Sequence, residues 1–228
     1  MQENKIKLSI LIPASRESVF NTLSSILSLD IQIPYEIILN TNSPIANLEQ
    51  NLLKNRWLKF SHLKISKNYF LDNWGESYKY LFNLAKGEYI YFLEDDDLLL
   101  TDFSFLDDSN LATKKEQKLN LSHLKNSSPD YYFGKYKYHV LRENINWKQE
   151  FFKLFKLNHK KLFFEYPNPD NFQSFQLSQL VIKKKIIKFF PITNNKYNDY
   201  YLFKNNPGKI KYLNKYFFQQ GIAKNNVS

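Results

Sequence analysis

The chain has 228 residues, a formal net charge of +10 and no cysteine. Its length suits one domain, and a 43% hydrophobic and 17% aromatic content excludes the composition of a disordered chain. Without cysteine there is neither a disulfide nor a thiolate metal site. No signal peptide and no transmembrane helix are expected, because no run of about 18 apolar residues occurs.

Strand-like and helix-like segments alternate over the first hundred residues. Strands are predicted at 7–13, 35–39, 57–65 and 88–93, with a helix between each pair. Ser15 and Ser43 are expected to cap the first two helices, with Pro44 in the first position of the second. Gly87 is expected to end the third helix as a C-cap glycine. The alternation predicts a doubly wound, mostly parallel sheet with helices on both faces.

The second half has weaker periodicity. We expect polar helix and loop at 101–128, strands at 130–141 and 175–182, a short helix at 196–205, and one or two short strands at 210–218. The aromatic-rich segment 147–175 is interpreted mainly as core packing of a variable region, with one or two side chains lining an acceptor site. No linker is long enough to divide the chain.

Four consecutive carboxylates, Glu94-Asp95-Asp96-Asp97, follow the predicted strand at 88–93. Ligands of parallel sheets bind where the strands end, so this acidic run should meet the loop after Pro13 and the turn at 40–43. Repelling carboxylates favour a bound cation, and oxygen ligands suit Mg²⁺ or Mn²⁺. The alternative is a solvated acidic turn that caps the next helix. The histidines show no metal-ligand spacing and are expected to be structural: His62, His123, His139 and His159.

Three segments carry recognisable motifs: LSILIPASR at 8–16, AKGEYIYFLEDDD at 85–97 and NDYYL at 198–202. They resemble motifs of family 2 glycosyltransferases of the GT-A fold, the type that builds bacterial surface polysaccharides. The first segment resembles that family's opening strand and nucleotide-contacting loop. The second closely resembles the signature A-x-G-E-Y-I-x-F-L-D-x-D-D, and the third resembles the later E-D-x-x-L motif.

The resemblance implies a single GT-A domain over 1–228, with a nucleotide-sugar half at 1–100 and an acceptor half at 101–228. Its activity would be inverting, metal-dependent transfer from a nucleoside diphosphate sugar, by default a UDP-sugar, to a hydroxyl of a glycan or glycolipid. Lipooligosaccharide or capsule synthesis is the expected setting. The protein is expected in the cytoplasm, with peripheral contact with the anionic inner membrane as a further expectation. Net charge alone favours nucleic acid, and no binding module supports such a partner.

The resemblance also implies residue roles. Asp96 and Asp97 would bind Mn²⁺ or Mg²⁺, and Asp199 would be the general base, with Glu165 and Asp170 as competing carboxylates. Asp199 could instead cap a helix. The donor pocket would be lined by Pro13, Ala14, Arg16, Asn40, Asn42, Glu94 and Asp95.

One segment departs from the family pattern. The turn at 40–43 reads Asn-Thr-Asn-Ser, where members usually carry V-D-D-G-S. Amides can still hydrogen-bond a base edge, but the asparagines also favour a non-catalytic nucleotide-sugar-binding protein. A nucleotidyltransferase is the other alternative, although it would normally show a Gly-rich loop after the first strand.

Overall fold

The structure, a computed structural model, describes residues 5–41, 44–45, 48–54, 62–68, 74–107, 129–137, 177–190, 202 and 205–219. Several predicted features lie outside these residues: the aromatic segment 147–175, Asn42, Ser43, His123, His139, His159, Glu165, Asp170 and Asp199. No helix among the described residues is long and apolar enough to cross a membrane.

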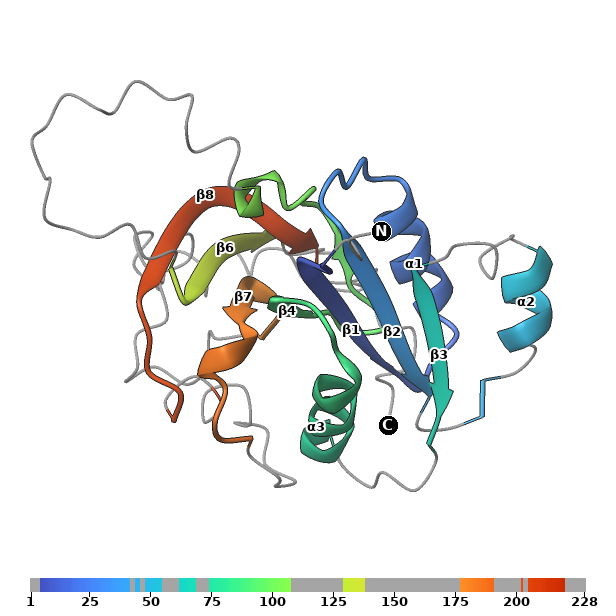
Figure 1. Cartoon of the computed structure of the whole chain (residues 1–228). Coiled ribbons are helices and arrows are strands. Elements are labelled where there is room, and N and C mark those ends of the chain that lie inside the picture. The colour runs from blue at the N-terminus through green and yellow to red at the C-terminus, as the bar shows by residue number, and fades with distance from the viewer. Residues whose placement is uncertain are drawn as a thin grey trace, which may run out of the picture.

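Eight strands form one sheet in the order β3-β2-β1-β4-β7-β6-β8-β5 (Figure 1). The strands are β1 (Leu8–Ala14), β2 (Tyr35–Thr41), β3 (Leu63–Lys67), β4 (Tyr89–Phe92), β5 (Leu98–Leu99), β6 (Tyr131–Lys137), β7 (Leu180–Lys183) and β8 (Ile210–Gln219). The helices are α1 (Val19–Leu27), α2 (Leu48–Lys54) and α3 (Trp74–Leu84), with short 3-10 turns η2 (Ser104–Leu106), η4 (Leu177–Gln179) and η5 (Lys184–Ile186).

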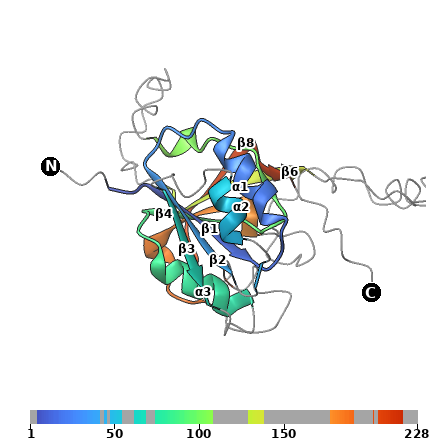
Figure 2. The same cartoon turned by 90° about the vertical axis from the view of Figure 1, so that its right-hand side faces the viewer.

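The first four strands run parallel and are covered on both faces. All seven residues of β1 are buried, as expected of a central strand between two helical layers. Ile10 and Ile12 belong to the core that α1 and α2 cover, whereas Leu11 and Ile38 belong to the core under α3. Figures 1 and 2 show the helices flanking the sheet in this arrangement. The predicted β-α-β-α-β-α-β order and doubly wound topology are confirmed.

The second half extends the same sheet with mixed pairing. β7 pairs antiparallel with β4 and β6, while β8 runs parallel to β6. The two residues of β5, just after the acidic run, pair antiparallel with the end of β8 through Leu98↔Gln219 and Leu99↔Phe218. Phe105 and Phe217 stack beside this pairing with ring centroids 5.4 Å apart. The chain after the acidic run is therefore held by the last described strand.

Two predicted helix starts are wrong. α1 begins at Val19 with Ser18 in the N-cap position, and Ser15 instead donates its backbone N–H to Asp95 at 2.8 Å. α2 begins at Leu48, so Pro44 lies before the helix and not in its first position. Residues 15–18 separate the end of β1 from the start of α1.

Gly87 ends the α3 segment for a different reason from the predicted one. No described glycine has a positive φ, so Gly87 is not a left-handed C-cap. A Cβ on Gly87 would lie 2.5 Å from the backbone nitrogen of Ser9, and the Gly87 N–H donates to Ser9 Oγ at 2.8 Å. Glycine is needed because the chain passes directly against β1 as it enters β4.

Candidate functional site

The acidic run lies at the carboxyl end of β4, beside the loop that joins β1 to α1. Leu93 donates its N–H to the Leu11 carbonyl at 3.0 Å, which carries the pairing of β1 and β4 to the last residue before Glu94. The chain then turns, with the Asp97 N–H donating to the Glu94 carbonyl at 3.2 Å. The acidic run therefore lies where open α/β sheets bind their ligands.

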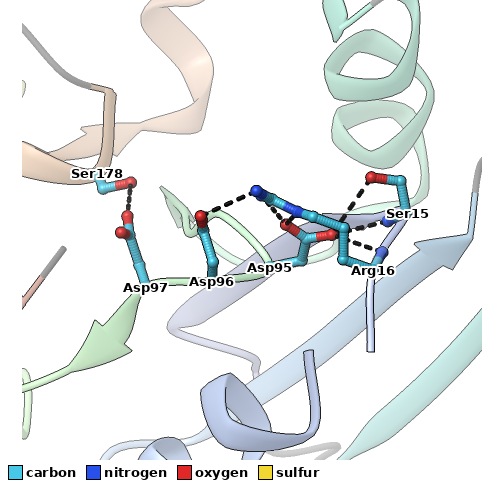
Figure 3. Close-up of polar contacts among 6 residues, drawn as sticks. All are labelled: Ser15, Arg16, Asp95, Asp96, Asp97 and Ser178. Atoms are coloured by element: carbon cyan, nitrogen blue, oxygen red, sulfur yellow. Dashed lines mark hydrogen bonds and ion pairs between the residues drawn. The ribbon is translucent and has the colours of Figure 1, made fainter. Parts of the chain in front are cut away.

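Asp95 is fully buried, and its carboxylate is used by the β1–α1 loop (Figure 3). Oδ2 accepts the backbone N–H groups of Ser15 and Arg16 at 2.8 and 3.0 Å. Oδ1 accepts Nε of Arg16 at 2.8 Å and a second guanidinium hydrogen bond from Nη2. These charge-assisted bonds fix the loop against the acidic run, so the role visible for Asp95 is to anchor Arg16.

Asp96 is the next carboxylate, and its side chain is 12% exposed. Its Oδ2 accepts Nη1 of Arg16 at 2.9 Å. Burial raises the pKa of Asp96 and the negative charge of Asp95 raises it further, which outweighs the opposing effect of Arg16. Arg16 therefore offsets only part of the cost of burying the ionised Asp96 carboxylate beside Asp95.

Asp97 points away from Arg16 and toward the second half of the sheet (Figure 3). Its Oδ2 accepts the hydroxyl of Ser178, on η4 just before β7, at 3.2 Å. Burial, and then the negative charge of Asp97, raise the pKa of the fully buried Tyr91. Asp97 therefore ties the acidic run to η4. Sequence reasoning did not single out Ser178, since nothing local marks that serine.

The described residues among the other predicted pocket residues lie at the same end of the sheet. Pro13 and Ala14 end β1 and pair with Asn40 and Thr41 at the end of β2. Pro13, Ala14 and Asn40 are buried, and Glu94 is half-buried. The predicted convergence of the strand ends of β1, β2 and β4 is confirmed, whereas donor contacts at these residues stay predictions. Asn42 and Asp199 lie outside the described residues.

The carboxylates fit a metal that arrives with phosphate groups better than a site made by protein alone. Among the described residues, no three Asp, Glu, His or Cys side chains are placed to hold one ion. Asp95 and Asp97 are buried, whereas the side chain of Asp96 is 12% exposed and pairs with Arg16, so a metal would reach Asp96 most readily of the three aspartates. Mg²⁺ is commonly held by one or two carboxylates together with substrate phosphates and water. The prediction that Asp97 binds metal remains a prediction.

Of the four histidines, only His62 lies within the described residues. Its ring stacks on Tyr35 with centroids 4.7 Å apart, and its Nδ1 lies 3.0 Å from the Tyr35 carbonyl oxygen. Both contacts lie at the amino end of β2, away from the acidic run. His62 has the structural role expected of it.

No protein-family model matches the sequence, and no curated protein matches it either. Solved structures do. Residues 1–349 of S. aureus TarS in complex with UDP-GlcNAc match with a TM-score of 0.62 at 15% identity, over 97% of this chain and 60% of that one. The chain has the GT-A glycosyltransferase fold. A second example is the mannosyltransferase PcManGT from Pyrobaculum calidifontis in complex with GDP-Man and Mn²⁺, with a TM-score of 0.60, 10% identity and coverage of 96% and 58%. The GT-A fold described here thus spans about 60% of the length of these two chains.

Proposed function

We propose that the chain is a glycosyltransferase that moves a sugar from a nucleoside diphosphate sugar to a hydroxyl of a glycan or glycolipid. The observation that carries the proposal is the GT-A fold with its acidic run at the carboxyl end of β4, against the β1–α1 loop. The motif resemblance in residues 85–97 supports membership of family 2, whose bacterial members build surface polysaccharides.

The donor is proposed to bind where the ends of β1, β2 and β4 meet. A UDP-sugar is the default, supported by the UDP-GlcNAc complex of TarS, and the GDP-Man complex of PcManGT makes a guanosine donor the first alternative to test. The proposed lining consists of Pro13, Ala14, Arg16, Asn40, Asn42, Glu94 and Asp95. The buried position of Asn40 and Asp95 means that they would act mainly by shaping the loops around the donor.

A divalent ion, Mn²⁺ or Mg²⁺, is proposed to bind at Asp96, with Asp97 as the second predicted ligand. The Mn²⁺ in the PcManGT complex and the incompletely neutralised Asp96 both support it. When bound, such an ion stabilises the charge that develops on the departing diphosphate. The protein's own part is to present the Asp96 carboxylate at this end of the sheet.

Asp199 is proposed as the general base that takes the proton of the acceptor hydroxyl. A carboxylate within hydrogen-bond reach of that hydroxyl suffices for a single displacement, which inverts the anomeric configuration. The acceptor half at 101–228 would supply the base, and the half at 1–100 would bind the donor. Glu165 and Asp170 are the next candidates.

Lipooligosaccharide or capsule synthesis in the cytoplasm is proposed as the setting, with peripheral binding to the anionic inner membrane. Lys211, Lys215 and Tyr216 on β8 are exposed, and each lysine near anionic lipid contributes about 1 kcal/mol. Binding to vesicles rich in phosphatidylglycerol should weaken as salt is added, measured by co-sedimentation. Binding that resists salt would contradict the membrane proposal.

The test of the activity is incubation with a panel of nucleotide sugars and Mn²⁺, with a bacterial glycolipid fraction as acceptor. Release of the nucleoside diphosphate that depends on one sugar supports a glycosyltransferase. Release or consumption of pyrophosphate would show a nucleotidyltransferase, and binding without turnover of any donor would show a non-catalytic binding protein. Either of these results would overturn the proposal.

A further inference from the structure

The guanidinium of Arg16 lies between two carboxylates of the acidic run (Figure 3). Nε and Nη2 donate to Oδ1 of Asp95, and Nη1 donates to Oδ2 of Asp96 at 2.9 Å. The three planar donor groups of one arginine thus hold neighbouring acids in one geometry, which a lysine cannot reproduce.

The two contacts of Arg16 differ in how readily they can be exchanged. Asp95 is fully buried and also accepts two backbone N–H groups, so its bond with Arg16 is part of the folded loop. Asp96 is 12% exposed and Arg16 is 35% exposed, so water and ligands reach their contact. The same guanidinium faces both carboxylates. The contact with Asp96 is therefore the exchangeable one.

We propose that Arg16 is a positioning residue that occupies Asp96 while the donor is absent and passes its Nη1 contact to a donor phosphate oxygen when metal binds Asp96. This inference rests on the proposed function. A divalent cation at Asp96 would lie beside the guanidinium, and these like charges repel. A diphosphate removes that conflict, because its oxygens attract both the metal and the arginine.

The proposal makes metal and nucleotide binding interdependent. Mn²⁺ alone must displace Arg16 from Asp96. When a nucleoside diphosphate binds with Mn²⁺, Arg16 gains a phosphate oxygen as its new partner. Each ligand then raises the affinity for the other by the same factor, since such coupling is reciprocal. An arginine that only secured the loop through Asp95 would leave the metal affinity unchanged when replaced by lysine.

The experiment measures Mn²⁺ binding by electron paramagnetic resonance in wild type and Arg16→Lys, first without nucleotide and then with UDP or GDP. Lysine keeps the charge beside Asp95 but cannot hold Asp96 as well. We expect the variant to bind Mn²⁺ at least about fivefold more tightly without nucleotide, and the nucleotide to add correspondingly less. Lys64→Arg, the reverse exchange beside the buried carboxylate of Glu36, is the matched control and should leave Mn²⁺ binding unchanged.

Equal Mn²⁺ affinities of wild type and Arg16→Lys without nucleotide would overturn the inference while leaving nucleotide binding and the proposed function intact. If thermal unfolding shows that the variant does not fold, wild type decides alone: its Mn²⁺ affinity must rise at least about fivefold with UDP or GDP, and an unchanged affinity refutes the exchange. A wild type that binds neither nucleotide at any Mn²⁺ concentration would refute the proposed function, and the role of Arg16 with it.

Discussion

Buried carboxylates lie at both ends of the parallel strands, and their surroundings differ. At the amino end, Glu36 on β2 is 2% exposed. Its Oε1 accepts hydrogen bonds from the Ser9 hydroxyl at 2.7 Å and from the Lys86 N–H at 2.6 Å, while Lys64 pairs with Oε2. One acid meets one base there. At the carboxyl end, Arg16 faces both Asp95 and Asp96, so the acids outnumber the base.

The difference is visible in the pKa values. Burial acts to raise the pKa of Glu36, but Lys64, Ser9 and the Lys86 N–H outweigh it and the pKa is lowered. Burial also raises the pKa of Asp96, and there the charge of Asp95 adds to it. A carboxylate with a lowered pKa stabilises the folded chain, and one with a raised pKa costs stability. The excess of negative charge therefore distinguishes the carboxyl end of the sheet, where the donor is proposed to bind.

The largest expected effect is on Asp96. Asp96→Asn keeps the shape of the side chain but removes the charge proposed to hold the metal, so nucleotide-sugar turnover should fall to the background rate. Excess EDTA should do the same to wild type. Since Asp96 is unfavourably placed as an anion, the thermal midpoint of the variant should not fall. Near wild-type turnover in the variant, or full activity in EDTA, would show that the surplus charge at this end serves no metal.

Asp199 is the carboxylate expected to act on the acceptor. Loss of a general base typically lowers the rate by about 10²- to 10⁴-fold, so Asp199→Asn should lower acceptor turnover by that factor. Nucleotide affinity, measured by calorimetry, should barely change because Asp199 is not among the residues proposed to bind the donor. Asparagine is also a good N-cap, so a purely capping aspartate predicts an unchanged rate. An unchanged rate would assign the role of general base to Glu165 or Asp170 instead.

Glu36 should show the opposite pattern to Asp96. Glu36→Gln leaves Lys64 without its buried partner and weakens the bonds to Ser9 and the Lys86 N–H, so the free energy of unfolding should fall by about 1–3 kcal/mol. Turnover per folded molecule should remain unchanged. Glu88→Gln is the matched control: Glu88 is 28% exposed and pairs with Lys7 at 3.2 Å, so its loss should cost at most about 1 kcal/mol. Equal losses of stability in urea for the two variants would show that the buried contacts of Glu36 contribute no more than a partly exposed ion pair.

The parallel half could be predicted because its signals are local. Hydrophobic spacing in 19–27 and the apolar runs of β1 and β4 depend only on neighbouring residues, and the acidic run follows β4 directly. The predicted capping role of Ser15 is wrong because of a contact between residues that are distant in the sequence. Serine is a common helix-capping residue, but the Ser15 N–H donates to the carboxylate of Asp95, 80 residues later.

The different contacts of the residues in the acidic run could not be predicted from the sequence of the run. Four adjacent carboxylates look equivalent, yet the loop uses Asp95 and Ser178 holds Asp97. The Ser178 contact depends on β7 returning beside β4 in antiparallel register, which no local pattern specifies. The pairing of β5 with β8, which holds the chain after the run, is likewise a contact between distant segments.

The smallest expected effect is a pair of opposite pH dependences, measured in urea with EDTA present. Glu36 has a lowered pKa, so its stabilisation is complete above the ordinary value of 4.5 and is lost as pH falls through the folded pKa. The stability difference between wild type and Glu36→Gln should therefore shrink on acidification.

Asp96 has a pKa raised above 3.8, so its ionisation costs stability as pH rises through the folded pKa. Relative to Asp96→Asn, wild type should lose stability as pH rises from about 3 to neutral, with a slope below about 1.4 kcal/mol per pH unit. If both stability differences changed with pH in the same direction, Glu36 and Asp96 would be stabilised in the same way and the contrast between the two ends of the sheet would be wrong.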